Sequence, residues 1–251
     1  MKYFKTELKE FINSFKLKFN FIQILLFDLI FYIVVLPSIY LAALIINRQG
    51  VKVDTTLLTP EAIATASELE ITLLSSQVRS LVVWTLVSFA VVFILALLTW
   101  SFTRGLIYTK LLKQKFTLKY FKKFIGLNIF LIMALIPILV FLAVLLKAEL
   151  MSFIVVSVAL LLAVAYFISL IYIQFTKNKQ LKVFASIGEG LSLGAKKFKK
   201  LLLPGILIII VGYIINVISV RLPPSTYTSI ILFAIFMAWA RIYFVSTVER
   251  V

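Results

Sequence analysis

Long apolar blocks alternate with short polar segments along the whole chain. The six blocks cover residues about 21–46, 80–103, 124–146, 150–174, 201–220 and 226–247. About 20 apolar residues in a helix are enough to cross the hydrocarbon core of a bilayer. Lipid offers no hydrogen-bond partner to the backbone, so each span is expected to be helical. The pattern predicts an all-α, polytopic integral membrane protein with six transmembrane helices.

Composition supports this class and narrows the chemistry. Hydrophobic residues make up 63% of the chain and charged residues only 14%, whereas soluble domains carry about 25% charged residues. Cysteine and histidine are both absent, which removes disulfides, common zinc ligands and the commonest general base. We therefore predict a non-enzymatic protein with no catalytic residues, no metal and no cofactor.

Basic residues fall mainly on one side of the predicted spans. Of the 26 Lys and Arg residues, 21 lie on one side: in the N-terminal segment, in the segments after spans two and four, and on the C-terminal side at Arg241, within span six, and Arg250. Cytoplasmic segments carry such an excess of Lys and Arg in membrane proteins. The distribution predicts a multi-pass protein of the cell membrane with cytoplasmic N- and C-termini.

Each odd-numbered span is preceded by a basic segment with a partly amphipathic pattern. Residues 3–18 place Leu8, Phe11 and Phe15 at spacings of three and four, which is typical of a helix lying in the membrane interface. Similar segments at about 108–122 and 184–199 suggest further interfacial helices. We predict one transmembrane domain, residues 1–251, built from three pseudo-repeated hairpins. Each hairpin is led by one basic helix, and the units are about 1–104, 105–177 and 178–251.

The longest predicted outer loop, residues 47–79, contains a helix-start signal. Thr59, Pro60 and Glu61 provide a cap, a proline at the first helical position and an acid in the first turn. A short helix is expected at about 60–70.

The segment QLKVFASIGEGLSLGAKKFKKLLLPGILIII, residues 180–210, combines a turn of small residues, a basic amphipathic helix and a span containing Gly and Pro. It resembles the cytoplasmic connection of uncharacterised six-span membrane proteins. These are related to the membrane domain that accompanies some glycerophosphodiester phosphodiesterases. The resemblance implies a fold, and because this sequence holds no phosphodiesterase domain it implies no activity.

GLSLG, residues 190–194, matches the nucleophile-elbow pattern with Ser192 at its centre. A working elbow needs a strand-to-helix turn and a histidine base. The surroundings here are helical and the chain has no His. Lys196 lies one turn beyond Ser192, so a Ser–Lys dyad is the catalytic alternative. We interpret the glycines as a joint that lets the basic segment turn into span five.

Polar residues inside the spans are few, and Asp28 is the most costly of them. It lies about eight residues, or about 12 Å, from the cytoplasmic end of its span, and Arg241 lies at nearly the same depth. We predict that the two side chains pair, with Arg104 as the reserve partner. An alternative is a protonated Asp28 that bonds to a neighbouring span. Asn128 and Asn216 are expected to serve as polar neighbours or as links between helices.

The cytoplasmic segments carry clustered lysines beside aromatic residues. The lysines expected to contact anionic lipid are Lys119, Lys122, Lys123, Lys196, Lys197, Lys199 and Lys200. Their position next to spans favours lipid head groups over nucleic acid as binding partners. The simpler alternative is that these lysines only set the membrane topology.

The sequence therefore favours a non-enzymatic membrane protein that interacts with lipid or belongs to a membrane complex, with a protein partner or a homo-oligomer left open. A small transporter or channel-like carrier is the first alternative, and a lipid-modifying membrane enzyme is the second.

Overall fold

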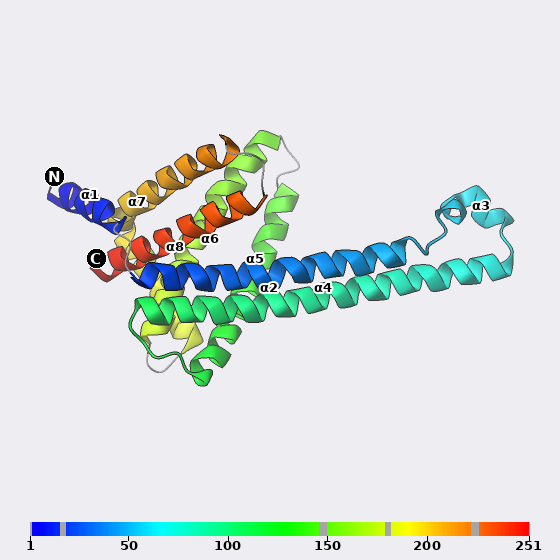
Figure 1. The fold of residues 1–251 in the computed structure, drawn as a ribbon, viewed down its shortest axis with the longest axis horizontal. Helices are drawn as coiled ribbons and strands as arrows, with labels where there is room; N and C mark the ends of the chain where they lie inside the picture. The colour runs from blue at the N-terminus through cyan, green and yellow to red at the C-terminus, as the bar shows by residue number, and fades with distance from the viewer. Residues whose placement is uncertain (1, 16–18, 146–149, 179–181, 222–225, 251) are drawn as a thin grey trace. The chain divides into compact units, whose positions relative to one another are not determined.

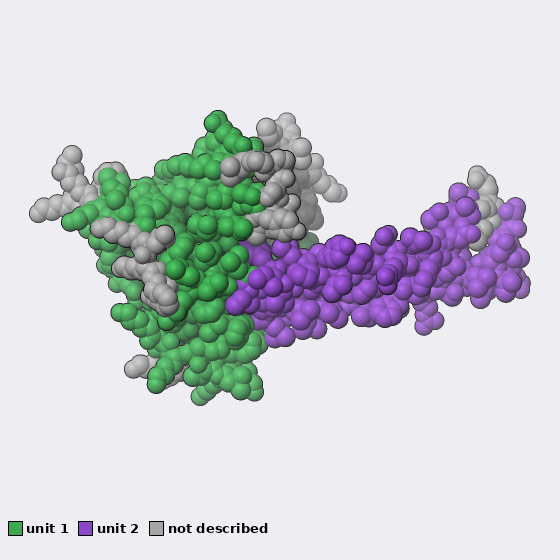
Figure 2. Space-filling model, in the orientation of Figure 1, with its two compact units in different colours: residues 1–29, 101–251 green, residues 30–100 purple. Residues whose placement is uncertain are grey.

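The computed structural model describes residues 2–15, 19–145, 150–178, 182–221 and 226–250, which contain helices and no strand. The elements are α1 (Lys2–Ser14), α2 (Phe19–Gly50), the 3₁₀ helix η1 (Thr55–Leu58), α3 (Pro60–Thr65), α4 (Glu68–Leu111), α5 (Leu118–Leu145), α6 (Leu150–Lys177), α7 (Val183–Arg221) and α8 (Thr226–Arg250). Figure 1 shows them in chain order. Figure 2 marks two compact units, one formed by residues 1–29 with 101–251 and the other by residues 30–100.

Six helices in the described ranges are long and apolar enough to cross a membrane: α2, α4, α5, α6, α7 and α8. This confirms the six predicted spans as helices, as expected of a multi-pass membrane protein. The helices run past the apolar blocks, since α2 continues to Gly50 and α4 already begins at Glu68. Polar residues at a helix end can lie outside the hydrocarbon, so hydropathy alone underestimates helix length.

The unit of residues 30–100 is a helical hairpin made from most of α2 and most of α4. Phe31 and Trp100 meet edge to face with ring centroids 5.4 Å apart. Large apolar side chains such as Leu86 and Phe89 are about two-thirds exposed (65% and 66%), as expected for surfaces that face lipid. With 44 residues, α4 is about 66 Å long, roughly twice the thickness of the hydrocarbon core.

The connection between these two helices corrects the predicted helix at 60–70. α3 begins at Pro60, as the cap signal indicated, but it ends at Thr65. A capping box then starts α4: the Ser67 backbone N–H donates to Glu70 Oε2 at 2.8 Å, and the Glu70 N–H donates to Ser67 Oγ at 3.4 Å. Earlier in the connection, hydrogen bonds from Thr56 lower the pKa of the Asp54 carboxyl.

The other unit contains the packed core. One cluster gathers buried side chains from α4, α5, α6, α7 and α8, including Tyr108, Phe124 and Phe175. A second cluster joins the start of α2 to α8 through residues such as Ile24 and Tyr243. α7 packs against both α6 and α8. These two units do not correspond to the three predicted hairpin units, and the repeat stays a prediction.

The predicted interfacial helix at 108–122 is not one helix. α4 ends in a Schellman motif, in which Gln114 N–H donates to Thr109 O at 2.8 Å and Lys113 N–H to Lys110 O at 3.3 Å. Lys113 takes the left-handed conformation this motif needs, with φ 54°. The chain leaves the helix here, and α5 begins only at Leu118.

The predicted interfacial helix at 184–199 is continuous with span five in α7, so its glycines are not a joint. A Cβ on Gly190 would lie 2.8 Å from the Ile171 Cα, and one on Gly194 would lie 2.7 Å from the Phe167 ring. The motif is therefore a small-residue contact that lets α7 approach α6 closely. Ser192 is exposed on α7.

The first predicted interfacial helix is α1, and residues 16–18 lie outside the described residues. One side of α1 packs on α8: Phe11 meets Trp239 edge to face at 5.8 Å, and Phe15 stacks on Trp239 at 4.9 Å. Trp239 Nε1 also donates to Ser14 Oγ at 3.0 Å. Ile12 remains 62% exposed, so only part of the apolar side of α1 is left for lipid.

Candidate functional site

Asp28 on α2 lies between two arginines. Its Oδ1 accepts a hydrogen bond from Arg104 of α4, and its Oδ2 accepts one from Arg241 of α8. The Asp28 side chain is 1% exposed, against 5% for Arg104 and 11% for Arg241. The structure thus brings Asp28 together with both arginines that the sequence proposed as partners.

The three charged residues lie at one level because of where they fall in their helices. Asp28 is nine residues from the start of α2, Arg104 is seven from the end of α4, and Arg241 is nine from the end of α8. At 1.5 Å per residue these separations are about 10–13 Å. The start of α2 and the ends of α4 and α8 therefore lie at the same end of the bundle.

A neutral hydrogen-bond network surrounds Asn128 of α5. Its Nδ2 donates to Ser101 Oγ of α4 at 2.9 Å and to the Phe124 carbonyl at 3.0 Å, and its Oδ1 accepts from the Tyr172 hydroxyl of α6. Ser101 lies one turn before Arg104 on α4. Asn128 therefore links three helices next to the charged group, as helix-linking asparagines do in membranes.

The charged group carries one more positive than negative charge. Two guanidinium groups share a single carboxylate, and arginine does not lose its proton in proteins. Charges within a bilayer cost at least about 2.5–3.5 kcal/mol each on insertion scales, so they are usually paired and face the bundle interior. Both arginines pair with the one carboxylate, so the group keeps a net charge of about +1.

A second buried acid, Glu7, holds α1 against α8. Its Oε1 accepts from the Tyr243 hydroxyl at 2.8 Å, from Thr247 Oγ1 at 3.3 Å and from Arg250 at 3.4 Å. As a charged residue in a basic amphipathic segment, Glu7 has the sequence pattern of a surface acid. Its spacing of four from Phe11 is the signal that puts both residues on the side that packs.

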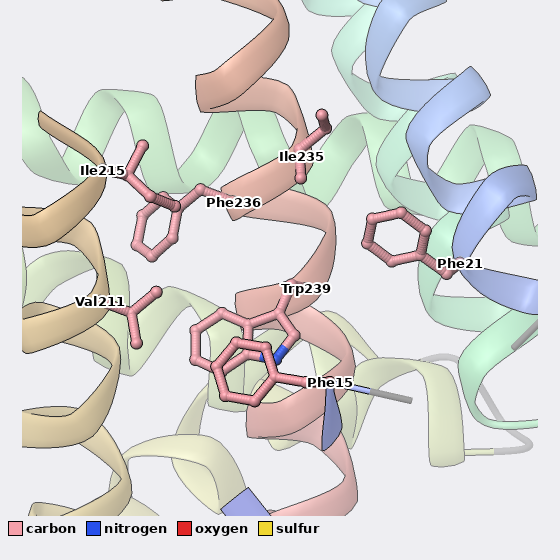
Figure 3. Close-up of a pocket in the computed structure, with 7 residues that line it drawn as sticks. All are labelled: Phe15, Phe21, Val211, Ile215, Ile235, Phe236 and Trp239. Atoms are coloured by element: carbon pink, nitrogen blue, oxygen red, sulfur yellow. The ribbon is translucent and has the colours of Figure 1, made fainter. Parts of the chain in front are cut away.

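A small apolar cavity of about 110 Å³ opens between α1, α2, α7 and α8 (Figure 3). Its lining residues are Phe15, Phe21, Val211, Ile215, Ile235, Phe236 and Trp239. Gly212 next to it allows close packing, since a Cβ there would lie 2.9 Å from the Phe236 ring. We call this cavity the apolar groove.

The remaining predicted residues lie apart from these sites. Asn216 is exposed on α7. Of the seven lysines proposed as lipid contacts, Lys123 and Lys197 are half-buried and the other five are exposed. Within the described ranges, no three Asp or Glu side chains gather in a way that could hold a metal ion.

Comparison with protein-family models, with curated proteins and with solved structures finds no match to this chain. The resemblance of residues 180–210 to six-span membrane proteins therefore stays a prediction.

Proposed function

We propose that this protein is a non-enzymatic, multi-pass membrane protein that binds membrane lipid, with both termini in the cytoplasm. The observation that carries the proposal is the apolar groove beside Trp239. All seven lining side chains are hydrophobic, and six of them are aromatic or isoleucine residues, contributed by Phe15 at the end of α1 and by α2, α7 and α8. A groove of this kind suits a hydrocarbon chain.

The surroundings of the groove favour a lipid acyl chain as its occupant. Ile235 on its edge is 37% exposed, and neighbouring α7 residues such as Tyr213 and Ile214 are 70% and 50% exposed. Apolar side chains of membrane-spanning helices that face outward are in contact with lipid. An opening among them is filled most readily by the acyl chains that already surround it.

The cytoplasmic orientation is proposed from the charges. Lys119 and Lys122 stand at the start of α5, and Lys196, Lys199 and Lys200 precede the apolar part of α7. Each lysine close to an anionic leaflet contributes about 1 kcal/mol, so these segments favour the cytoplasmic surface. A phospholipid whose chain enters the groove would find basic head-group partners on this side of the membrane.

Photocrosslinking tests lipid binding in the groove. The purified protein is reconstituted with a phosphatidylcholine that carries a diazirine on one acyl chain, and crosslinked peptides are mapped by mass spectrometry. Ile215→Trp should fill the groove and remove crosslinks to its lining residues. Ile209→Trp is the matched control, because Ile209 is 48% exposed and six residues away on another side of α7. Equal crosslinking of the lining residues in both variants would contradict the proposal.

Cysteine labelling tests the orientation in this Cys-free chain. Ala64→Cys on α3 and Gln114→Cys after α4 are both exposed positions. An impermeant maleimide added outside intact cells should label the first and leave the second unlabelled until the membrane is opened. Labelling of the second position from outside would reverse the proposed orientation.

A further inference from the structure

The excess positive charge around Asp28 points to a second ligand, different from the acyl chain proposed for the apolar groove. None of the groove-lining residues belongs to the group formed by Asp28, Arg104 and Arg241. This group holds two guanidinium ions and one carboxylate, with a net charge of about +1. A protein needing only to neutralise Asp28 would do so with one arginine. The second arginine therefore calls for a role of its own.

We propose that Arg241, supported by Arg104, binds a phosphate group, and that Asp28 holds the two guanidinium groups in position for it. Arg241 is the more exposed of the two arginines, at 11% of its side chain. A guanidinium has five N–H donors in a rigid fork. Within the described residues, the hydrogen bond from Arg241 goes to Asp28 Oδ2, which leaves most of that fork to a ligand.

A phosphate suits this geometry better than a monovalent halide. Guanidinium groups bind phosphate through two parallel, charge-assisted hydrogen bonds. The bound phosphate would also balance the excess positive charge, which no buried carboxylate of the group offsets. Asp28 would then serve as a positioning residue: each of its oxygens fixes one arginine, so the two forks are ordered before the ligand arrives.

The depth of the group is compatible with a lipid head group. The three residues lie about 10–13 Å from the helix ends. The head-group layer occupies about 5–7 Å on each side of the hydrocarbon core, so the group sits a few ångströms below it. A phosphate from a phospholipid and a free phosphate entering from the cytoplasm both satisfy this chemistry.

Thermal unfolding in a phosphate-free maltoside detergent tests the proposal and separates the two sources. In one arm, sodium phosphate is compared with sodium chloride at equal ionic strength. In the other, micelles are doped with phosphatidic acid or with a diacylglycerol of the same chains, which lacks only the phosphate. We expect phosphatidic acid to raise the Tm of the wild type by several degrees and diacylglycerol to leave it unchanged. A rise with sodium phosphate would identify a soluble anion as a second source.

The variants distinguish a ligand site from a pair that only closes the bundle. Arg241→Gln leaves a neutral pair of Asp28 and Arg104, so it should fold without ligand and lose the phosphate-dependent rise. The apparent Kd should weaken by at least about tenfold, because hydrogen bonds to a charged group are lost. Arg221→Gln removes the same charge from the exposed end of α7 and should keep the full rise.

Two further variants keep the test decisive if Arg241→Gln does not fold. Asp28→Asn keeps both positive charges and removes the carboxylate that positions the two guanidinium groups, so the Tm rise with phosphate should be smaller than in the wild type. Arg241→Lys keeps the positive charge but loses the forked arrangement of N–H donors, so its Tm should rise less with phosphate than that of the wild type. Absence of any rise in the wild type, or an equal rise in the wild type and in every variant at position 241, would overturn the proposal. The groove test uses zwitterionic lipid and other residues, so either proposal can fail alone.

Discussion

Gly190 is the position where a single added methyl group should most clearly disturb the packing of α6 and α7. In the structure, a Cβ at Gly190 would lie 2.7 Å from Ile171 Cγ1, 2.8 Å from its Cα and 2.9 Å from its backbone nitrogen. Carbon atoms attract best at about 3.5–4.0 Å, so the methyl would come about 0.8 Å too close. Two of the three atoms belong to the backbone, and no rotamer change can move them away.

The expected magnitude follows from two opposing effects. Alanine favours a helix over glycine by about 1 kcal/mol, which stabilises any Gly→Ala change in α7. Overpacking a well-packed contact costs about 1–3 kcal/mol, and a clash with backbone belongs in the upper part of that range. Gly190→Ala should therefore lower the free energy of unfolding by about 1–2 kcal/mol.

Gly188→Ala is the matched control, because it lies two residues away in the same helix and a Cβ there meets nothing within 4 Å. It keeps the propensity gain without the clash and should stabilise the protein by about 0.5–1 kcal/mol. Unfolding by sodium dodecyl sulfate in mixed micelles, followed by intrinsic fluorescence, compares both variants with the wild type. The difference between them isolates the cost of the contact.

A second-site change refines the test. A Cβ at Gly194 would meet only side-chain atoms, of Phe167 and Leu170, so Gly194→Ala should cost less and should be rescued by Phe167→Leu. Ile171→Ala should rescue Gly190→Ala poorly, since the backbone of residue 171 remains in place. If Gly190→Ala is as stable as Gly188→Ala, α6 and α7 do not approach each other as closely at Gly190 as the structure shows.

Two further predictions concern the charged group and α1. Asp28→Asn should destabilise the protein by about 3–5 kcal/mol, because two buried guanidinium groups lose their carboxylate. Adding Arg241→Gln to this variant should recover part of the lost stability, as measured by thermal unfolding. Strictly additive effects of the two changes would show that the two residues are not coupled. Phe11→Asp should release α1 from α8 and make the N-terminal segment more sensitive to protease. Ile12→Asp changes an exposed position of the same helix and should leave the segment protected. Equal cleavage of the two variants would argue against the packing of α1 on α8.

The sequence by itself determined the helices and their order, because lipid forces an apolar stretch of sufficient length to satisfy its backbone internally. It also placed Asp28 and Arg241 at one depth, since the rise per residue of a helix is constant. The start of α3 could be read from Pro60 for a similarly local reason. The end of α4 could not, because Lys113 adopts its left-handed conformation without the glycine that usually marks such an end.

Only the tertiary structure decided which face of each helix meets which neighbour. Asn128 and Asn216 look alike in sequence, yet the first links three helices and the second is exposed. Glu7 looks like a surface acid, and it is buried because Tyr243 and Thr247 lie opposite it on α8. In spans that are apolar all round, the hydrophobic pattern carries little information about the buried side. The buried side of each helix is set by the packing of small residues and the pairing of rare polar groups. Both depend on residues far apart in the chain.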